Sequence, residues 1–179
     1  MNFGANNITD YGLYFQWGDT QGYEISNTEK EFSGSDYKYF DTTTGQYTKY
    51  NETDNKKILD LEDNAVCAIL GGNWKIPSPE DFLELQENTT YSFVFNYQES
   101  GINGVLLTSN INGNTLFFPA GGQRAYNISG SSAGVLGYYL SNSLYNIIQL
   151  CACMYFNPGS VTFNSSTGRT NGCTIRPVF

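Results

Sequence analysis

The stretch GGNWKIPSPEDFLEL (residues 71–85) ends one helix and begins another. Gly71 and Gly72 can adopt the left-handed backbone conformation that closes a helix. Ser78 suits the N-cap position, and Pro79 suits the first helical position because its missing amide hydrogen would have no partner there. The two acidic residues that follow favour the positive end of the helix dipole. The stretch therefore predicts two helices joined by a short connection.

Apolar residues on both sides of this connection define the expected buried faces. In the first helix, over residues 61–70, four apolar residues share one face by their spacing: Leu61, Ala65, Ala68 and Ile69. Cys67 is expected there as a small buried hydrophobe. In the second helix, the residues expected to be buried are Phe82, Leu83 and Leu85.

After the second helix the sequence is typical of strands and turns. Residues 104–110 and 114–119 predict a hairpin, and its turn contains Asn112 and Gly113, a pair that tolerates positive φ. The other short strands that we expect cover residues 12–19, 137–143, 150–156, 160–164 and 174–179.

The composition favours an α+β domain rich in strands. Aromatic residues make up 16% of the chain and there are 19 glycines, so helices should be few. Residues 20–57 are polar and have no apolar period, which predicts a loop on the surface. A chain of 179 residues suits one domain, over residues 1–179.

Charge is distributed unevenly along the chain. The net charge is −8, and every Asp, Glu and Lys precedes residue 100, so residues 100–179 carry only three arginines. Recognition of phosphates needs clustered cations, so we expect no nucleic-acid partner. The sequence has no apolar run long enough for a membrane span and no signal-peptide pattern at its start, so we expect no membrane insertion.

Several motifs occur in an order that resembles one protein family. They are WGDT at 17–20, GGNWKIPSPEDF at 71–82, NGNTLFFPAGGQR at 112–124, GYYLSNSL at 137–144, FNPGSV at 156–161 and GCTIRPVF at 172–179. Together they are similar to the C-type-lectin-like domains of gut Bacteroidetes surface proteins and their phages. The similarity is strongest to the variable proteins of diversity-generating retroelements, and it covers nearly the whole chain.

This resemblance implies a C-type-lectin-like fold, related to that of formylglycine-generating enzymes. The fold would have two helices, a small twisted antiparallel sheet, long loops, and paired N- and C-terminal strands. The function would be ligand binding by an exposed face within about residues 138–176, diversified at template adenines. The carrier would be a phage tail tip or a bacterial surface protein, through which the domain could oligomerise. The partner would be a protein or glycan receptor on a cell surface.

The run LCACMYF (residues 150–156) decides which side chains we expect on that face. In a strand the side chains point alternately to opposite faces. We expect one set to face the core: Leu150, Ala152, Met154 and Phe156. We expect the other set to face the solvent: Cys151, Cys153 and Tyr155. Exposed thiols are unusual, and apolar residues just upstream extend the same surface. The candidate ligand-binding residues are Tyr145, Ile147, Ile148, Cys151, Cys153, Tyr155, Thr162, Asn164, Thr170 and Cys173.

The resemblance also explains why these residues look arbitrary. Adenine substitution in Asn codons can produce every residue from Tyr145 to Cys173 except Gln149 and Met154. Met154 belongs to the inward set, whereas Gln149 is either a fixed position or an argument against diversification. A partly buried hydrophobic edge, or a subunit contact, is the alternative explanation for the same residues.

Other site chemistries fit the sequence less well. Calcium binding by the late loops needs acidic oxygens, and no acid follows Glu99. Zinc binding by Cys151, Cys153 and Cys173 lacks the usual spacing, and the chain has no His to complete the ligands. We therefore expect free thiols, no metal, no cofactor and no enzymatic activity.

Two alternatives to a diversified binding domain stay open. One is a formylglycine-generating-like cysteine oxidase that uses a late cysteine pair, and the other is an invariant structural domain of a surface protein. Among the other landmarks, Trp17 and Trp74 are expected in the core. Arg176 is expected to pair with an acidic residue of the first half.

Overall fold

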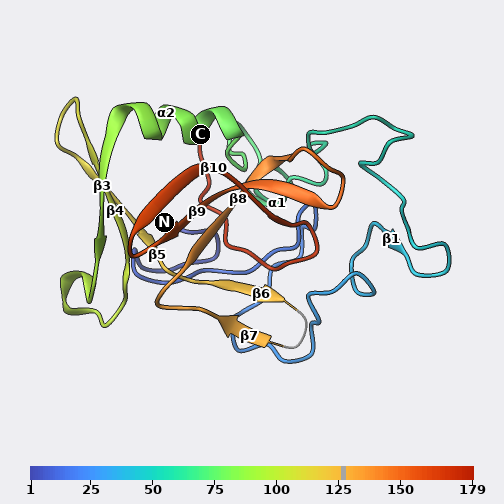
Figure 1. The fold of residues 1–179 in the computed structure, drawn as a ribbon, viewed down its shortest axis with the longest axis horizontal. Helices are drawn as coiled ribbons and strands as arrows, with labels where there is room; N and C mark the ends of the chain where they lie inside the picture. Colours follow the sequence, from blue (N-terminus) through green and yellow to red (C-terminus); the bar gives the residue numbers. More distant parts are fainter. Residues whose placement is uncertain (126–127) are drawn as a thin grey trace.

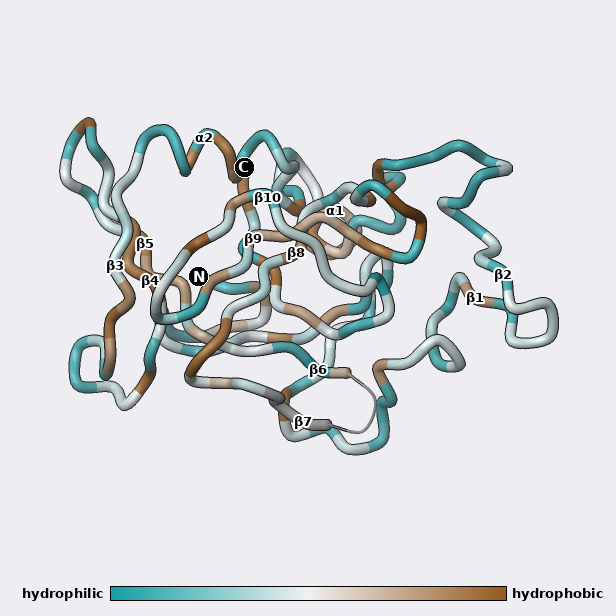
Figure 2. Tube along the Cα trace, viewed as in Figure 1, coloured by the Kyte–Doolittle hydropathy of each residue, from teal (hydrophilic) through white to brown (hydrophobic). Residues whose placement is uncertain are grey.

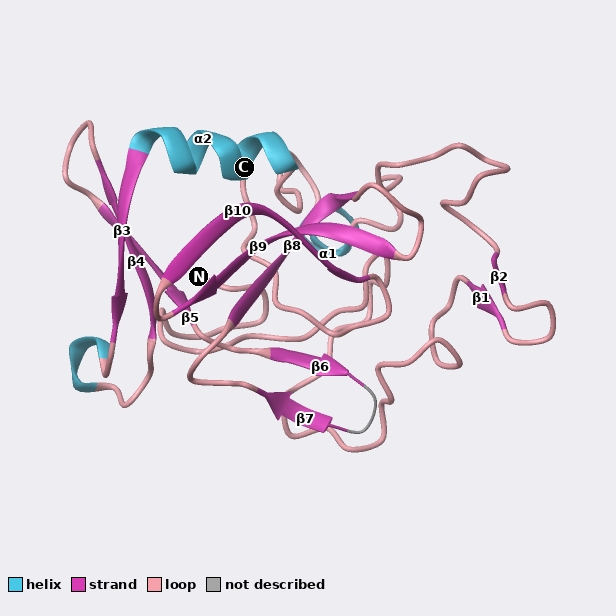
Figure 3. Cartoon of the chain, viewed as in Figure 1, coloured by secondary structure: helices cyan, strands magenta, loops and turns pink. Residues whose placement is uncertain are grey.

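The computed structural model describes residues 1–125 and 128–179. Within them the chain is a small α+β protein with two α-helices and several antiparallel sheets (Figure 1; Figure 3). The helices are α1 (Ala65–Leu70) and α2 (Pro79–Asn88), with a short 3₁₀ turn at Tyr97–Glu99. The strands are β1 (Phe40–Asp41), β2 (Gln46–Tyr47), β3 (Thr89–Val94), β4 (Gly104–Ser109), β5 (Thr115–Pro119), β6 (Gln123–Ala125), β7 (Ile128–Ser131), β8 (Gly137–Leu144), β9 (Leu150–Asn157) and β10 (Ser160–Gly168).

The last three strands form the sheet on which the rest of the chain packs. This central sheet has the order β10-β9-β8, and both of its strand pairs are antiparallel. Tyr139 lies opposite Met154, and Leu140 lies opposite Cys153. Figure 1 shows α2 running along one side of this sheet, with the β3–β4–β5 sheet beyond one end of the helix.

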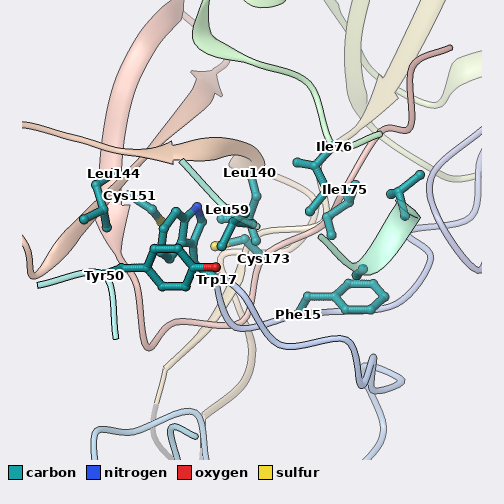
Figure 4. Close-up of a cluster of buried hydrophobic side chains, with 12 residues drawn as sticks. Phe15, Trp17, Tyr50, Leu59, Ile76, Leu140, Leu144, Cys151, Cys173 and Ile175 are labelled. Carbon is teal, nitrogen blue, oxygen red and sulfur yellow. The ribbon is translucent and has the colours of Figure 1, made fainter. Parts of the chain in front are cut away.

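Each face of the central sheet is covered by its own hydrophobic cluster. The first, which we call the Trp17 cluster (Figure 4), contains Phe15, Trp17, Tyr50, Leu59, Ala65, Val66, Ile76, Leu140, Leu144, Cys151, Cys173 and Ile175. The second, the Phe82 cluster, contains Phe82, Val105, Leu107, Phe118, Ala120, Tyr139, Met154, Phe156 and Phe163. The central sheet is therefore an internal layer between the N-terminal segments and α2.

This double coverage corrects the expected division of β9 into an inward and a solvent face. Ala152, Met154 and Phe156 are buried as expected, but Cys151 and Cys153 are only 0% and 1% exposed. They face the Trp17 cluster, because their partners Leu144 and Leu140 belong to it. A strand buried on both faces has a continuous apolar run, and alternation within such a run does not identify a solvent side.

The hairpin and the second helix form as the sequence predicts, but of the three helix residues expected to be buried only Phe82 is, because Leu83 is exposed and Leu85 is partly buried. β4 and β5 pair from Gly104↔Pro119 to Thr108↔Thr115, and Gly113 in the turn has a φ of 73°. At the start of α2, the Ser78 side chain accepts from the Asp81 amide at 3.1 Å, and the Asp81 carboxylate accepts from the Ser78 amide at 2.7 Å. Each group satisfies a backbone donor that the helix leaves free.

The first helix is shorter than predicted and buries a different face. It begins after Asn64, whose side chain accepts from the Cys67 amide at 3.2 Å, and Gly71 follows it with positive φ. Ala65 and Val66 are buried, whereas Leu61 and Ile69 are largely exposed and Cys67 is only partly covered. The cap at Asn64 excludes Leu61 from the helix, so the spacing that included it does not describe one face.

The N-terminal segment pairs with the C-terminal segment only through isolated bridges. Phe15 bridges Cys173, the Phe3 amide donates to the Ile175 carbonyl, and Val178 bridges Lys75 of the connection between the helices, so the strands expected over residues 12–19 and 174–179 do not form as regular strands. Residues 20–57 are largely irregular, as predicted. They are not only a surface loop, however, because Phe32, Tyr37 and Tyr50 are buried.

The position of the thiols gives a direct test of the internal layer. Burial raises the pKa of Cys153 to about 12, and it also raises the pKa of Cys151 and Cys173. Since the thiolate is the reactive form, an aqueous disulfide reagent should react with only Cys67 in the folded protein, at pH 7 and at pH 9 alike.

Denaturant should make the other three thiols reactive, and a Cys67→Ser variant should be silent until it unfolds. Titration of more than one thiol in the native protein would contradict the double burial of β9.

Candidate ligand-binding surface

The loop between β8 and β9 forms one wall of a hollow at the end of the central sheet. The hollow has a volume of about 370 Å³ and lies between residues 51–57 and 144–149, and we call it the loop hollow. Ile147 is 54% exposed, and Tyr145 and Ile148 are partly exposed. Figure 2 shows this loop as a hydrophobic stretch beside a hydrophilic one. Glu52, Lys56 and Lys57 supply charges on the facing wall.

A buried arginine holds the two walls of the loop hollow together. The guanidinium of Arg169 donates to the carbonyl oxygens of Tyr50 at 3.0 Å and Lys49 at 3.1 Å. Lys49 and Tyr50 directly precede the wall formed by residues 51–57, and Arg169 also donates to the carbonyl oxygen of Ile148, on the opposite wall, at 3.1 Å. The fourth acceptor is the hydroxyl oxygen of Tyr37, at 2.9 Å from Nε. Every acceptor is neutral, and the side chain is fully buried.

Aromatic rings complete the surroundings of this guanidinium. Its central carbon lies 5.1 Å from the ring centroids of Trp17 and Tyr37 and 4.4 Å from that of Tyr47. Aromatic faces attract cations, and this attraction is stronger where water is excluded. The backbone of Arg169 adds two further bonds, because its amide donates to the Gln149 carbonyl and its carbonyl accepts from the Trp17 amide.

A second polar centre fixes residues 49 and 50, which directly precede the facing wall of the loop hollow. The carboxylate of Asp63 accepts from Lys49 at 2.6 Å, from Lys38 at 3.0 Å, from Tyr50 at 2.6 Å and from Tyr39. Burial alone would raise the pKa of Asp63, but these hydrogen bonds hold it well below its usual range. Asp60 and Glu62 lie close enough to Asp63 to share a metal ion, but the Lys49 ammonium already bridges all three carboxylates.

The predicted site residues fall into three groups. Tyr145, Ile147 and Ile148 lie together in the loop hollow, and Thr170 directly follows Arg169 near the same end of the sheet. Tyr155, Thr162 and Asn164 are partly or fully exposed at the other end of β9 and β10, where Thr162 lies opposite Tyr155. The third group is buried: Cys151, Cys153 and Cys173.

The prediction that these three cysteines contribute to a contact surface is therefore wrong. Cys151 and Cys173 belong to the Trp17 cluster. Cys153 is buried on the same face of the central sheet, opposite Leu140 of that cluster. Free cysteine behaves as a small hydrophobe, so core packing explains all three without reference to a ligand. The other seven predicted residues keep at least part of their surface accessible.

Two other landmarks differ from expectation. Trp17 is fully buried, and its indole donates to the Ser141 carbonyl at 3.0 Å, but Trp74 is 40% exposed and packs against Phe179. The seven ion pairs among the described residues all involve lysines, so none of their carboxylates pairs with Arg176. Arg176 instead contacts the Phe118 ring and neutral oxygens.

Sequence reasoning missed the facing wall and its support. Asn51, Asn55 and their charged neighbours belong to a polar segment that has no pattern of its own. Arg169 has no acidic residue nearby in sequence, and three of its four acceptors are backbone carbonyls, which every residue carries. The only available signal was an unpaired arginine in a nearly uncharged half of the chain.

Comparisons of the chain with protein-family models, with curated proteins and with solved structures found no match. Among the described residues, neither helix has the length and apolar character required to cross a membrane. The case for function therefore depends on the chemistry and geometry of the surface.

Replacing Arg169 by lysine should separate the two walls of the loop hollow. Lysine keeps the charge but cannot reach four acceptors in a fixed plane, so we expect a loss of about 2–4 kcal/mol in the free energy of unfolding. Hydrogen exchange measured by mass spectrometry should become faster in residues 145–149.

Arg124→Lys is the matched control. Arg124 is also buried, but its guanidinium donates to the carbonyls of Glu24, Asn27 and Lys30, outside the loop hollow. This variant should lose stability while exchange in residues 145–149 stays unchanged. Equal acceleration in both variants would mean that Arg169 has no particular role in the loop hollow.

Proposed function

We propose that this chain is a non-enzymatic ligand-binding domain and that the loop hollow is the centre of its contact surface. The observation that carries the proposal is the exposed Ile147, which lies beside Tyr145 on the β8–β9 loop. The buried Arg169 holds this loop by a hydrogen bond to the Ile148 carbonyl. Apolar and aromatic groups on an exposed loop provide contact area. Because the loop is already ordered, a partner would not have to supply the entropy of ordering it.

The composition of the surface supports a macromolecular partner. The apolar loop tip is next to asparagines that offer amide donors and acceptors, and to charges of both signs on the facing wall. An apolar centre with a polar rim is the usual anatomy of a protein–protein interface. We propose a protein or glycan receptor on a cell surface as the partner.

We further propose a C-type-lectin-like fold and a diversified C-terminal region for this domain. Two helices, a twisted antiparallel sheet, long irregular segments and the bridges between the terminal segments are compatible with that fold. Diversification would act on the accessible residues Tyr145, Ile147, Ile148, Tyr155, Thr162, Asn164 and Thr170. The buried cysteines lend it no support. A phage tail tip or a bacterial surface protein would carry the domain.

The burial of the late thiols favours binding over the cysteine-oxidase alternative. An oxidase needs a cysteine that substrate can reach, and burial raises the pKa of all three late cysteines, which suppresses the reactive thiolate. The remaining alternative, an invariant structural domain, differs from ours in its genetic prediction. Our proposal requires a near-copy of the coding end beside a reverse-transcriptase gene, differing from it mainly at adenines.

The loop hollow predicts a specific loss of binding. A fluorescent tetramer of the domain should bind intact cells of a subset of gut Bacteroidetes strains. Ile147→Ser should reduce this binding at least about tenfold, as expected when an interface anchor is truncated, with no change in the melting temperature. Ile111→Ser is the matched control, because Ile111 is 79% exposed on the β4–β5 turn.

Equal binding by both variants would place the contact surface elsewhere. A strain panel without any binder, tested together with a glycan array, would remove the support for a cell-surface receptor.

A further inference from the structure

A second cavity lies on the opposite side of the central sheet from the Trp17 cluster and does not include the loop hollow. It has a volume of about 930 Å³ and lies between α2, the β4–β5 hairpin and the C-terminal residues 176–178, and we call it the helix cleft. Protein sites for small ligands have volumes of roughly 300–1,000 Å³. The size of the helix cleft therefore suits a small organic ligand.

Apolar residues from three segments form part of the walls of the helix cleft. Phe82 and Leu85 come from α2, Leu107 and Phe118 from the hairpin, and Val178 from the C-terminal segment. Leu116 is 41% exposed at the same place. Asparagine and hydroxyl side chains of the hairpin and the end of α2 add neutral polar groups to the lining. The helix cleft therefore offers apolar surface together with polar groups that could orient a ligand.

Arg176 is the one cation among the residues that line this cleft, and it is poorly satisfied. Only its Nη1 donates hydrogen bonds, to the Phe117 carbonyl at 3.4 Å and to the Asn2 side-chain oxygen at 3.5 Å. Both distances are long for hydrogen bonds. Nε and Nη2 have no hydrogen-bond partner among the described residues, and neither atom is completely buried.

The other two arginines show what a structural arginine looks like in this protein. Arg169 has four acceptors within 3.1 Å, and Arg124 has three carbonyl acceptors, one of them at 3.5 Å, although its Nε is buried without a partner among the described residues. Arg176 has free donors beside a cavity instead. Burial lowers the pKa of Arg176, because less water surrounds its charge, and an anion next to it would offset this cost.

The acidic residues of the cleft leave room for such an anion. Asp81 accepts from the Ser78 amide and pairs with Lys75 at 3.5 Å, so its charge is already compensated. Glu84 is exposed on α2, where solvent screens its charge.

We propose that the helix cleft binds an amphipathic carboxylate, with the guanidinium of Arg176 holding the carboxylate and the apolar walls covering a hydrocarbon body. Guanidinium and carboxylate have matching planar geometry and form paired hydrogen bonds. This site is separate from the loop hollow, and the proposal does not depend on the proposed receptor.

Octanoate and 1-octanol provide matched probes, because they have the same chain and differ in charge. Titration followed by protein-detected NMR should show saturable octanoate binding, with shifts concentrated in α2, β4, β5 and residues 176–178. We expect octanoate to bind at least about tenfold more tightly than 1-octanol, as for a charge-assisted hydrogen bond in a partly buried site. Arg176→Gln should abolish this difference, whereas Lys56→Gln in the loop hollow should keep it.

Substitutions of Leu116 test the proposal without removing Arg176, which also packs on Phe118. Leu116→Lys should strengthen octanoate binding and Leu116→Glu should weaken it, while neither affects cell binding through the loop hollow. Equal affinities for octanoate and 1-octanol, shifts centred outside the helix cleft, or identical behaviour of the two Leu116 variants would overturn the proposal.

Discussion

The hydrogen bonds of Arg169 determine how the irregular half of the molecule meets the ordered half. Its guanidinium is fully buried, with acceptors from three separate segments and the rings of Trp17, Tyr37 and Tyr47 around it. A buried cation left without partners costs several kcal/mol, so these acceptors must stay in place. The position of residues 47–51 relative to the β8–β9 loop therefore follows from one side chain.

The uneven charge of the sequence has the same physical explanation. Residues 100–179 carry only three arginines, and two of them are buried against backbone carbonyls of residues 24–50. Carbonyl oxygens can replace carboxylates as partners, because each has two lone pairs and costs less to desolvate than a charged carboxylate. The C-terminal half is thus attached to a polar segment that would otherwise have few buried groups to keep it ordered.

Local signals in the sequence were sufficient for part of the fold. Ser78, Pro79 and Gly113 act through their own backbone conformation or a partner three residues away, so the second helix and the hairpin were predictable. Burial of Cys151 and Cys153 depends on segments more than a hundred residues away in sequence. The alternation of side chains within β9 cannot predict that these segments cover the strand. For the site, the accessible surface of Tyr145 and Ile147 was predictable because they are apolar residues in a polar loop, but the facing wall was not.

The internal position of β9 limits which sequences the C-terminal region can accept. A residue change at Cys151, Cys153 or Met154 alters the packing of a hydrophobic cluster on one side of the sheet, and cores respond even to single methylene groups. In a population of randomly altered copies, most changes on this strand would lower the yield of folded protein before any partner is met. Folding would act as the first filter on such a population, and recognition as the second.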